Sequence, residues 1–327
     1  MKIAWVLPRY LPDAPAGAEW TAHEFLKYMV GRGHQAHALV VGDEAKPQRL
    51  YDLEGVHVTH LTAIRDCFAS NLDVVIGHLG YSDLARDVCG PDTLRVWMAH
   101  AEYQYQWSGA LMPDLYLANS KHVRDAGHQR GYGPVALLRP HCPPERCVSP
   151  NAVPPIDRPY VGLVSTSIGK GVGTFRKVML FDKQRRYMAV RGGYDPQTLH
   201  AGKRGRLEVA NPTMDMASIY AHMRVILMPS TAESWGRVAV EAGHNGIPVI
   251  STPTTGVKEA MGSAIIYADR RNPHEYVSAL KALDIRHIYR ACSDDARLRA
   301  ASMTHSTLQD MGKLAVQLED ATSRTAA

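Results

Sequence analysis

Short apolar runs alternate with amphipathic stretches along the first part of the chain. The strand-like runs cover residues 2–8, 37–41, 56–61, 73–77, 94–99 and 115–118. After the first of them, residues 18–32 place their apolar side chains on one helical stripe, which ends at Gly31 and Gly33. Because strands that alternate with helices form parallel sheets with both faces covered, this half predicts an α/β domain.

A proline-rich break separates this pattern from a second one like it. Seven prolines fall between Arg139 and Pro159, a density that excludes regular helix or sheet. Strand-like runs then resume at 160–164, 187–190, near 207, 225–228, 248–251 and 264–267. Helical patterns begin at 171, cover 216–222 and 237–245, and continue from 272. We therefore expect a first domain over 1–145, a linker over 146–159 and a second domain over 160–305. A C-terminal helix over 306–327 is available to pack back on the first domain.

Composition agrees with a globular protein of two domains. The chain has 327 residues, 45% of them hydrophobic and 21% charged. No apolar run approaches the ~20 residues of a membrane span, and residues 1–8 lead directly into a strand without a cleavage site. These features favour a cytoplasmic protein, which is also able to sit at a membrane surface.

The cysteines favour reduced thiols. There are five of them, an odd number, and they form no Cys-x-x-Cys pair: Cys67, Cys89, Cys142, Cys147 and Cys292. A zinc site built on Cys142 and Cys147 stays open as an alternative, but no second ligand pair has metal spacing.

Basic charge is concentrated in one stretch. The chain carries a net charge of +5, yet residues 170–206 hold ten Lys or Arg against Asp182 and Asp195, a local balance of +8. Such a stretch suits the phosphates of a nucleotide, an anionic membrane or a nucleic acid. The simpler interpretation is a solvated face with one contact to a substrate phosphate.

Two carboxylates mark the strongest candidate site. A strand-like run ends at Met228, a polar turn carries Glu233, and a helix that begins near Gly236 carries Glu241 on its inner face. Carboxylates accept hydrogen bonds from sugar diols, and unpaired N–H groups at a helix start favour a diphosphate. A nucleotide sugar needs both features.

The spacing of these residues resembles a known signature. Glu233, seven residues, Glu241 and then Ala-Gly-x-x-Gly-x-Pro-Val-Ile is similar to the pattern of the family 4 retaining glycosyltransferases. The resemblance implies a GT-B fold, α/β, with two Rossmann-like domains that face a central cleft. It implies that Glu233 contacts the donor sugar near its anomeric centre and that Glu241 holds the ribose hydroxyls. The implied contacts to the rest of the donor come from Ser234, Trp235, Gly236, Arg237 and Val238.

A second motif of the resemblance is Gly169-Lys170-Gly171. It implies that Lys170 reaches the donor phosphates and acts in catalysis. A Walker A loop is excluded, since that motif needs Gly at 164 and Ser or Thr at 171, where this chain has Val164 and Gly171. Many family members have an arginine at the position of Ser165. Either Arg191 or Arg237 supplies that charge here, or donor binding is weaker.

Weaker motifs lie in the first half. The loop before the first helix resembles the family's Gly-Gly-x-Glu, with Gly17 as the glycine that lets the backbone approach the diphosphate and the acceptor. His100 ends a strand and resembles the family histidine that touches the transferred sugar; the alternative is a satisfied polar residue. Asn119-Ser120 reads as a helix N-cap, and Gly256 as the tight turn of a Gly-Gly-x-x-Glu loop.

These observations together predict a retaining glycosyltransferase that moves a hexose-like sugar from a UDP- or GDP-type donor to an acceptor hydroxyl. No metal or other cofactor is expected, because no Asp-x-Asp occurs and basic groups are available to offset phosphate charge. The alternatives are a GT-B sugar-nucleotide epimerase or phosphorylase, and a nucleotide-sugar-binding protein with weakened catalysis. Acceptor candidates are a glycan or lipid, a small metabolite, a protein and hydroxylated bases in DNA, the last through the basic stretch 170–206.

Overall fold

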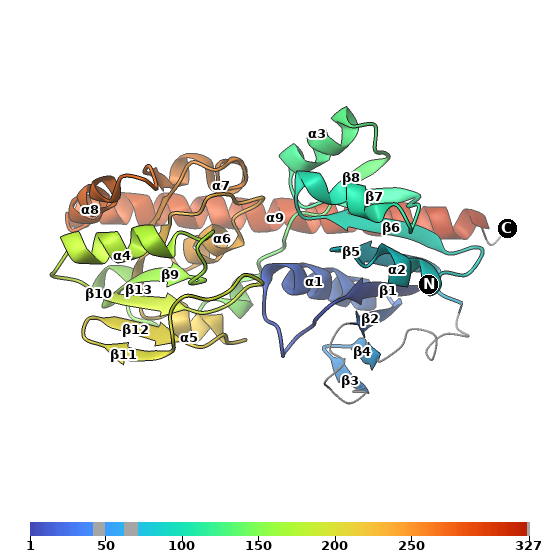
Figure 1. The fold of residues 1–327 in the computed structure, drawn as a ribbon, viewed down its shortest axis with the longest axis horizontal. Helices are drawn as coiled ribbons and strands as arrows, with labels where there is room; N and C mark the ends of the chain where they lie inside the picture. The colour runs from blue at the N-terminus through green and yellow to red at the C-terminus, as the bar shows by residue number, and fades with distance from the viewer. Residues whose placement is uncertain (42–49, 62–70, 326–327) are drawn as a thin grey trace. The chain divides into compact units, whose positions relative to one another are not determined.

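The computed structural model describes residues 1–41, 50–61 and 71–325, which divide into two compact units (Figure 1). Unit 1 comprises residues 1–141 and 307–327, and unit 2 comprises residues 142–306. Cys67 lies outside the described residues. Among the described residues, no helix is long and apolar enough to cross a membrane.

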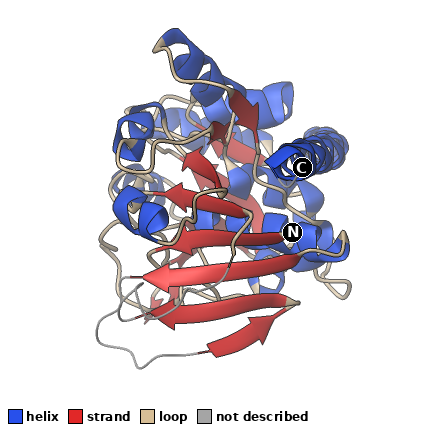
Figure 2. Ribbon diagram, turned by 90° about the vertical axis from the view of Figure 1, so that its right-hand side faces the viewer, coloured by secondary structure: helices blue, strands red, loops and turns tan. Residues whose placement is uncertain are grey.

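Unit 1 is built on an eight-stranded sheet in the order β3-β4-β2-β1-β5-β6-β7-β8. The strands are β1 (Lys2–Leu7), β2 (Gln35–Val41), β3 (Leu50–Leu53), β4 (Val56–Leu61), β5 (Val74–His78), β6 (Leu94–Ala99), β7 (Leu115–Ala118) and β8 (Val135–Leu137). All neighbours pair in parallel except β3, which runs against β4 at the edge. Figure 2 shows these strands as a stack of arrows. The six predicted strands are all present, and β3 and β8 are additional.

Helices cover both faces of this sheet. They are α1 (Gly17–Gly31), α2 (Ser82–Asp87), the 3₁₀ segment η2 (Glu102–Ser108) and α3 (Lys121–Gln129). Successive side chains of a strand point to opposite faces, so each strand feeds two cores. On β1, Ala4 and Val6 pack with residues of α2, η2 and α3. Trp5, which points the other way, meets Phe25 of α1 with ring centroids 6.4 Å apart.

Unit 2 repeats the design with a seven-stranded sheet in the order β11-β12-β10-β9-β13-β14-β15. Its strands are β9 (Tyr160–Val164), β10 (Arg186–Val190), β11 (Gly202–Arg204), β12 (Leu207–Ala210), β13 (Met223–Met228), β14 (Val249–Ser251) and β15 (Ile266–Tyr267). Only β11 runs antiparallel to its neighbour. The helices are α4 (Val172–Phe181), α5 (Met216–Tyr220), α6 (Arg237–His244), α7 (Thr255–Met261), α8 (Pro273–Ala282) and α9 (Arg286–Thr325).

Alternation along β13 separates two apolar cores in unit 2. Val225 and Leu227 pack with residues of α4 and α8, whereas Ile226 and Met228 pack with residues of α6, α7 and α9. A strand that is apolar on both faces is what a parallel sheet buried between helices requires. The predicted strands and helices therefore form a GT-B arrangement of two Rossmann-like units.

The boundary between the units falls after His141, near the start of the proline-rich stretch, so residues 142–159 of that stretch belong to unit 2. That stretch contains the 3₁₀ turns η3 (Pro144–Arg146) and η4 (Pro155–Asp157) rather than free linker. Cys142 and Cys147 are buried in the unit 2 core, and the Asn245 side chain donates to the Cys147 carbonyl at 2.8 Å. The linker expected over 146–159 is thus packed chain, because its apolar residues find a core.

The C-terminal helix is longer than the predicted segment over 306–327. α9 starts at Arg286 and runs for 40 residues, and its part from residue 307 groups with unit 1. There Arg139 forms a buried ion pair with Asp310, and Arg32 binds Glu319 with its Nη2 2.8 Å from Oε2. The chain therefore completes unit 1 with its last helix (Figure 1).

Candidate active site

The candidate residues of unit 2 lie where the strand order reverses. β9 stands between β10 and β13, so the chain leaves β9 toward one side of the sheet and returns on the other. Ligands of such sheets bind beyond the carboxyl ends of the strands at this switch point. The segment Ser165–Lys170 follows β9, and Pro229–Gly236 follows β13. Both predicted motifs of this unit therefore flank the same switch point.

Lys170 and Glu233 meet there in an ion pair. Lys170 Nζ lies 2.7 Å from Glu233 Oε1, and the Ser230 hydroxyl donates to the same oxygen at 2.7 Å. The Glu233 side chain is only 11% exposed. Its other oxygen, Oε2, makes no hydrogen bond with the described residues. Glu233 is thus held by one oxygen and presents the other.

The two loops approach each other closely through a glycine. Thr231 N donates to the Gly169 carbonyl at 2.8 Å. Gly171, which begins the α4 helix with φ +83°, lies so close to β13 that a Cβ there would stand 2.2 Å from the Pro229 carbonyl oxygen. No side chain fits that gap, and a left-handed φ also favours glycine. Gly171 therefore permits the contact between Lys170 and Glu233.

Glu241 is fixed by two partners on α6 and α5. Arg237 Nε donates to Glu241 Oε1 at 2.7 Å across one helical turn, and the Tyr220 hydroxyl donates to Oε2 at 2.7 Å. Tyr220 is fully buried, and burial together with the adjacent carboxylate raises the pKa of its phenol well above the usual value. It therefore stays a donor. Each carboxylate oxygen keeps a second acceptor site, which suits a diol.

The start of α6 lies between the two carboxylates. Gly236 is its N-cap with φ +95°, and no side chain of the described residues forms an N-cap hydrogen bond there. These groups and the positive end of the helix dipole form a site for a diphosphate. Trp235 is buried in the core beneath this turn, and Val238 lies in the first helical turn. Residues 234–238 thus lie at the start of α6, and their contacts to a donor remain a prediction.

The turn 233–235 is held by Gly256, the second residue of α7. Its N–H donates to the Glu233 carbonyl at 3.1 Å. A Cβ at this position would lie 2.3–2.5 Å from backbone atoms of Glu233, Ser234 and Trp235. A glycine is therefore required by close approach of two backbone segments.

Ser165 and Arg191 are neighbours at adjacent strand ends. Val164 pairs with Val190, and Ser165 N donates to the Val190 carbonyl at 2.9 Å. The Arg191 guanidinium donates from Nη1 to Asn211 Oδ1 at 3.3 Å, and its Nε is buried without a partner among the described residues. The cationic Arg191 therefore follows the strand next to the one that Ser165 follows.

Gln197 ties these strand ends together. Its Oε1 accepts from Thr166 N at 2.8 Å, from the Thr166 hydroxyl at 3.0 Å and from Gly192 N at 3.1 Å. Its Nε2 donates to the Asp195 carbonyl at 2.8 Å. The loops after β9 and β10 are thus cross-linked by one amide before any ligand arrives.

Two predicted residues belong to unit 1. Gly17 opens α1, and a Cβ there would meet no atom of the described residues within 4 Å, so none of their contacts requires glycine. His100 follows β6; its N–H donates to Gln104 Oε1 at 2.7 Å and its carbonyl accepts from Asn119 Nδ2 at 3.1 Å. Burial lowers the pKa of His100 to about 4. His100 is therefore neutral near pH 7 and rigidly held.

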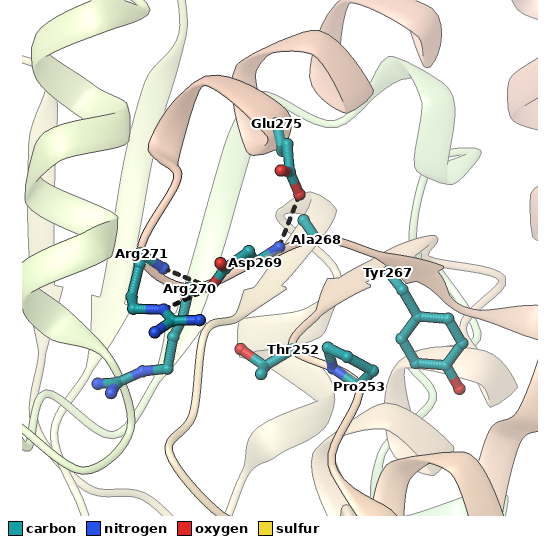
Figure 3. Close-up of a pocket in the computed structure, with 8 residues that line it drawn as sticks. All are labelled: Thr252, Pro253, Tyr267, Ala268, Asp269, Arg270, Arg271 and Glu275. Atoms are coloured by element: carbon teal, nitrogen blue, oxygen red, sulfur yellow. Dashed lines mark hydrogen bonds and ion pairs between the residues drawn. The ribbon is translucent and has the colours of Figure 1, made fainter.

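An open cavity of about 680 Å³ lies at the carboxyl ends of β14 and β15 (Figure 3). Its lining residues are Thr252, Pro253, Tyr267, Ala268, Asp269, Arg270, Arg271 and Glu275. Arg270 Nε donates to the Pro229 carbonyl at 3.3 Å, so the cavity borders the turn that carries Glu233. It contains none of the predicted site residues.

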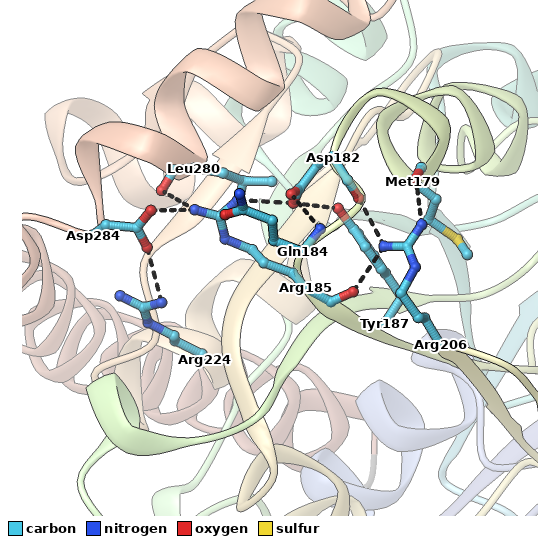
Figure 4. A network of polar contacts seen from close by, with 9 residues as sticks. All are labelled: Met179, Asp182, Gln184, Arg185, Tyr187, Arg206, Arg224, Leu280 and Asp284. Atoms are coloured by element: carbon cyan, nitrogen blue, oxygen red, sulfur yellow. Dashed lines mark hydrogen bonds and ion pairs between the residues drawn. The ribbon is translucent and has the colours of Figure 1, made fainter.

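Much of the basic stretch 170–206 is engaged inside unit 2. Arg185 Nη1 lies 2.8 Å from Asp182 Oδ2 and also pairs with Asp284, while Arg206 donates to three backbone carbonyls (Figure 4). Of the rest, Arg176 and Lys177 are on α4 and Lys203 and Arg204 are on the edge strand β11. The ten basic residues thus do not share one element: some form ion pairs or hydrogen bonds within unit 2, and others lie on different helices and strands.

The described residues contain no group of three or more His, Cys, Asp or Glu that is placed to hold a metal ion. Cys142 and Cys147 lie in the unit 2 core, and burial raises the pKa of the Cys147 thiol.

Several residues of the site were not singled out as functional in the sequence. Ser230, Gln197 and Asn211 gave no pattern signal, and Tyr220 reads as core from its neighbours. His78 did carry a signal, since it ends an apolar strand just as His100 follows one. The contacts of Gln197 with Thr166, of Asn211 with Arg191 and of Tyr220 with Glu241 join positions 20 to 31 residues apart, which only the packing of separate elements brings together.

Among known proteins, the sequence matches fall mainly on unit 2. Residues 162–284 match the model of the family described as glycosyl transferases group 1. A D-inositol 3-phosphate glycosyltransferase of Corynebacterium kroppenstedtii is 33% identical over 94 residues, 28% of this chain and 19% of that protein. A protein of the same name from Corynebacterium urealyticum is 36% identical over 74 residues, 22% of this chain and 18% of that protein. The matches thus span only about a fifth of these relatives.

Solved structures match the whole fold. Sucrose-phosphate synthase from Thermosynechococcus elongatus superimposes with a TM-score of 0.77 at 15% identity, over 98% of this chain and 99% of that one. Anabaena Alr3699/HepE, in complex with UDP-glucose, gives a TM-score of 0.73 at 15% identity over 99% and 100%. At this identity the likeness establishes the fold.

Proposed function

We propose that this protein is a retaining glycosyltransferase, because residues 162–284 match the model of the glycosyl transferases group 1 family and the chain has the GT-B fold. It moves a hexose-like sugar from a nucleoside diphosphate to an acceptor hydroxyl. The observation that carries the proposal is the pair Glu233 and Glu241, each oriented by its own donors, on either side of an uncapped helix start.

Each part of this arrangement has a task in donor binding. Glu241 accepts hydrogen bonds from the two ribose hydroxyls. Each of its carboxylate oxygens has a second acceptor site beside the one that Arg237 or Tyr220 uses. The N–H groups at the start of α6 hold the diphosphate. Glu233 Oε2 accepts a sugar hydroxyl near the anomeric carbon, while Oε1 stays bound to Lys170 and Ser230.

Catalysis then rests on charge that develops at the leaving diphosphate. Lys170 stands beside Glu233 and is 37% exposed, so it is available to neutralise that charge. The acceptor hydroxyl attacks from the side that the diphosphate leaves, which retains the anomeric configuration, and a diphosphate oxygen takes the hydroxyl proton. His100 contacts the transferred sugar. The reaction needs no metal, because Lys170, Arg191 and the helix start supply the positive charge.

Arg191 supplies the positive charge that many family members have as an arginine at position 165, where this chain has Ser165. It is the neighbour of Ser165 on the adjacent strand, and its guanidinium has a buried Nε without a partner among the described residues. Arg237 is the weaker candidate, since its Nε is bound to Glu241. Replacing Arg191 by Ala should weaken donor binding about tenfold, the value of one charge-assisted hydrogen bond.

The first donors to test carry uridine. Structures of Alr3699/HepE are named in complex with UDP and in complex with UDP-glucose. GDP-type donors are the second class. The names of the relatives also suggest a small phosphorylated polyol or sugar as acceptor. The acceptors to test next are a glycan or lipid, a protein and a hydroxylated DNA base. Binding to a polyanionic surface has less support, because Arg185 and Arg206 of the basic stretch are engaged within unit 2.

The test combines binding with transfer. Thermal shift and calorimetry with UDP-glucose, UDP-N-acetylglucosamine and GDP-mannose identify the donor, and radiolabelled donor is then offered to each acceptor class. Glu233→Ala should abolish transfer, and Glu241→Ala should chiefly weaken binding. Glu145→Ala, an exposed carboxylate of the same unit, is the control and should change neither. Full transfer activity in the Glu233 variant would remove the basis of the assignment.

A nucleotide-sugar-binding protein without catalysis is the second candidate, favoured by Ser165 and by Ala16 and Thr255 where the family has glycines. It would bind the donor with the same dependence on Glu241 but release no sugar to any acceptor or to water. An epimerase or phosphorylase of this fold would instead change the donor without an acceptor hydroxyl or with phosphate.

A further inference from the structure

A pair of histidines stands beside the switch point of unit 1. The strand order reverses at β1, which lies between β2 and β5, and His78 is the last residue of β5. His100 follows β6, two positions beyond Met98, which pairs with His78. Their rings meet with centroids 5.2 Å apart and planes at 66°. His78 was not among the predicted site residues.

One hydrogen bond joins the two rings. His78 Nδ1 lies 3.1 Å from His100 Nε2. A contact of this length between two imidazole nitrogens needs one N–H and one bare nitrogen. Burial keeps both rings neutral near pH 7, since it lowers the pKa of His100 to about 4 and that of His78 well below its usual value. The pair therefore holds a single proton in this bond, and the tautomers of the two rings are coupled.

Two coupled states are available. In the first, His78 Nδ1–H donates, His78 Nε2 is bare, and His100 carries its own proton on Nδ1. In the second, His100 Nε2–H donates, His78 Nε2 is protonated, and His100 Nδ1 is bare. In both, Nδ1 is the nitrogen of His100 that remains for a ligand, because it makes no hydrogen bond with the described residues.

The burial of His78 decides between them. His78 is 0% exposed, and its Nε2 has no hydrogen-bond partner among the described residues. Trp5, whose ring meets His78 edge-on at 6.1 Å, already has a buried indole N–H without an acceptor. The second state would add another orphaned N–H to this apolar region, whereas the first leaves a bare nitrogen. Among buried backbone groups, an N–H without a partner is rarer than an acceptor without one, and the same preference favours the first state here.

We infer that His78 is a positioning residue that fixes His100 as the Nδ1–H tautomer, so that His100 presents a hydrogen-bond donor to an oxygen of the transferred sugar. The role toward the sugar rests on the proposed function; the tautomer does not. The backbone of His100 is already held on both sides by Gln104 and Asn119, so the bond from His78 adds the ring orientation and the proton position.

The tautomer is tested by NMR of protein labelled with ¹⁵N-histidine, near neutral pH, with His100→Gln to assign the signals. In the native chain, His100 should show a protonated Nδ1 and a bare Nε2. A free imidazole modestly prefers the opposite tautomer, so His78→Phe, which leaves no donor, should move His100 toward Nε2–H. A native His100 with Nε2–H, or one unchanged in the His78→Phe variant, overturns the inference.

Kinetics provide the second readout. His78→Phe should lower the kcat of transfer about tenfold with little change in the Kd for UDP, while His78→Asn, whose amide can donate from the position of Nδ1, should restore most of it. Equal losses in both variants, with native thermal stability in each, would count against positioning. If the native chain transfers no sugar from any donor, the proposed function fails, and the NMR result still judges the tautomer.

Discussion

A methyl group at residue 256 would strike the turn that carries Glu233. In the Gly256→Ala variant, the added Cβ would lie 2.3 Å from Ser234 C, 2.4 Å from the Glu233 carbonyl oxygen and 2.5 Å from Trp235 N. All three are backbone atoms, so no side chain can rotate away. Ordinary contacts of this kind begin at 3.4 Å, and the turn must therefore move by about 1 Å.

That movement has two measurable consequences. A displacement of about 1 Å at a catalytic group costs about 100-fold in rate, and overpacking costs about 1–3 kcal/mol of stability. We expect kcat/KM for UDP-glucose, or for the donor that the binding screen identifies, to fall about 100-fold. Urea unfolding should show the loss of stability. The N–H of residue 256, which donates to the Glu233 carbonyl at 3.1 Å, would be displaced with it.

Gly173→Ala is the matched control. Gly173 lies in α4, and a Cβ there would meet no atom within 4 Å in the part of the chain that the structure describes. Alanine in a helix is favoured over glycine by about 0.5–1 kcal/mol, so this variant should be as stable as the native chain or more so, with native kinetics. A Gly256→Ala variant with native donor kinetics would refute the claim that the turn at Glu233 belongs to the site.

Three further predictions concern buried polar groups. Tyr220→Phe removes the donor to Glu241 Oε2 and should weaken binding of the donor nucleotide about tenfold in calorimetry. Asp310→Ala leaves Arg139 without its buried carboxylate and should cost about 3–5 kcal/mol in urea unfolding. Stability should fall as the pH drops from about 6.5 toward 4, because the unfolded chain binds a proton at His100 that the folded chain resists; His100→Gln should remove up to about 3 kcal/mol of that dependence.

Each of these has its own contrary result. Unchanged nucleotide affinity in Tyr220→Phe would mean that Glu241 does not depend on its orientation. Asp320→Ala, an exposed carboxylate of the same helix, should stay within about 0.5 kcal/mol of the native chain, and an equal loss in Asp310→Ala and Asp320→Ala would contradict the buried pair. A pH dependence unaffected by His100→Gln would show that other groups resist protonation.

The periodicity of the chain predicts most of the fold. Long apolar runs such as those of β1, β6 and β13 carry enough signal, because their side chains are buried on both faces of a sheet. The short strands β3, β8 and β11 carry too little. The helical pattern from 272 conceals the break between α8 and α9 at residues 283–285, since no glycine or proline marks it.

The candidate site is predictable only where it is local in sequence. Glu233 and Glu241 share one strand–turn–helix segment, so their spacing alone indicates that both serve one ligand. Tyr220 reaches Glu241 from another helix, and Arg191 reaches the side of Ser165 from another strand. Such contacts depend on the register between elements, which the order of residues does not reveal. The local charge of +8 over residues 170–206 overstates the basic surface for the same reason. Asp284, far along the chain, pairs with Arg185 and neutralises part of that charge.

Calorimetric titration of UDP-glucose into the native chain and into its Glu241→Gln variant decides whether Glu241 belongs to a nucleotide-sugar site. We expect one saturable site in the native chain and an affinity at least tenfold weaker in the variant, whose amide can accept from the ribose at only one atom. GDP-mannose replaces UDP-glucose if the binding screen selects it. Native affinity in the Glu241→Gln variant, or no binding of any nucleotide sugar to the native chain, would show that Glu241 does not bind a donor.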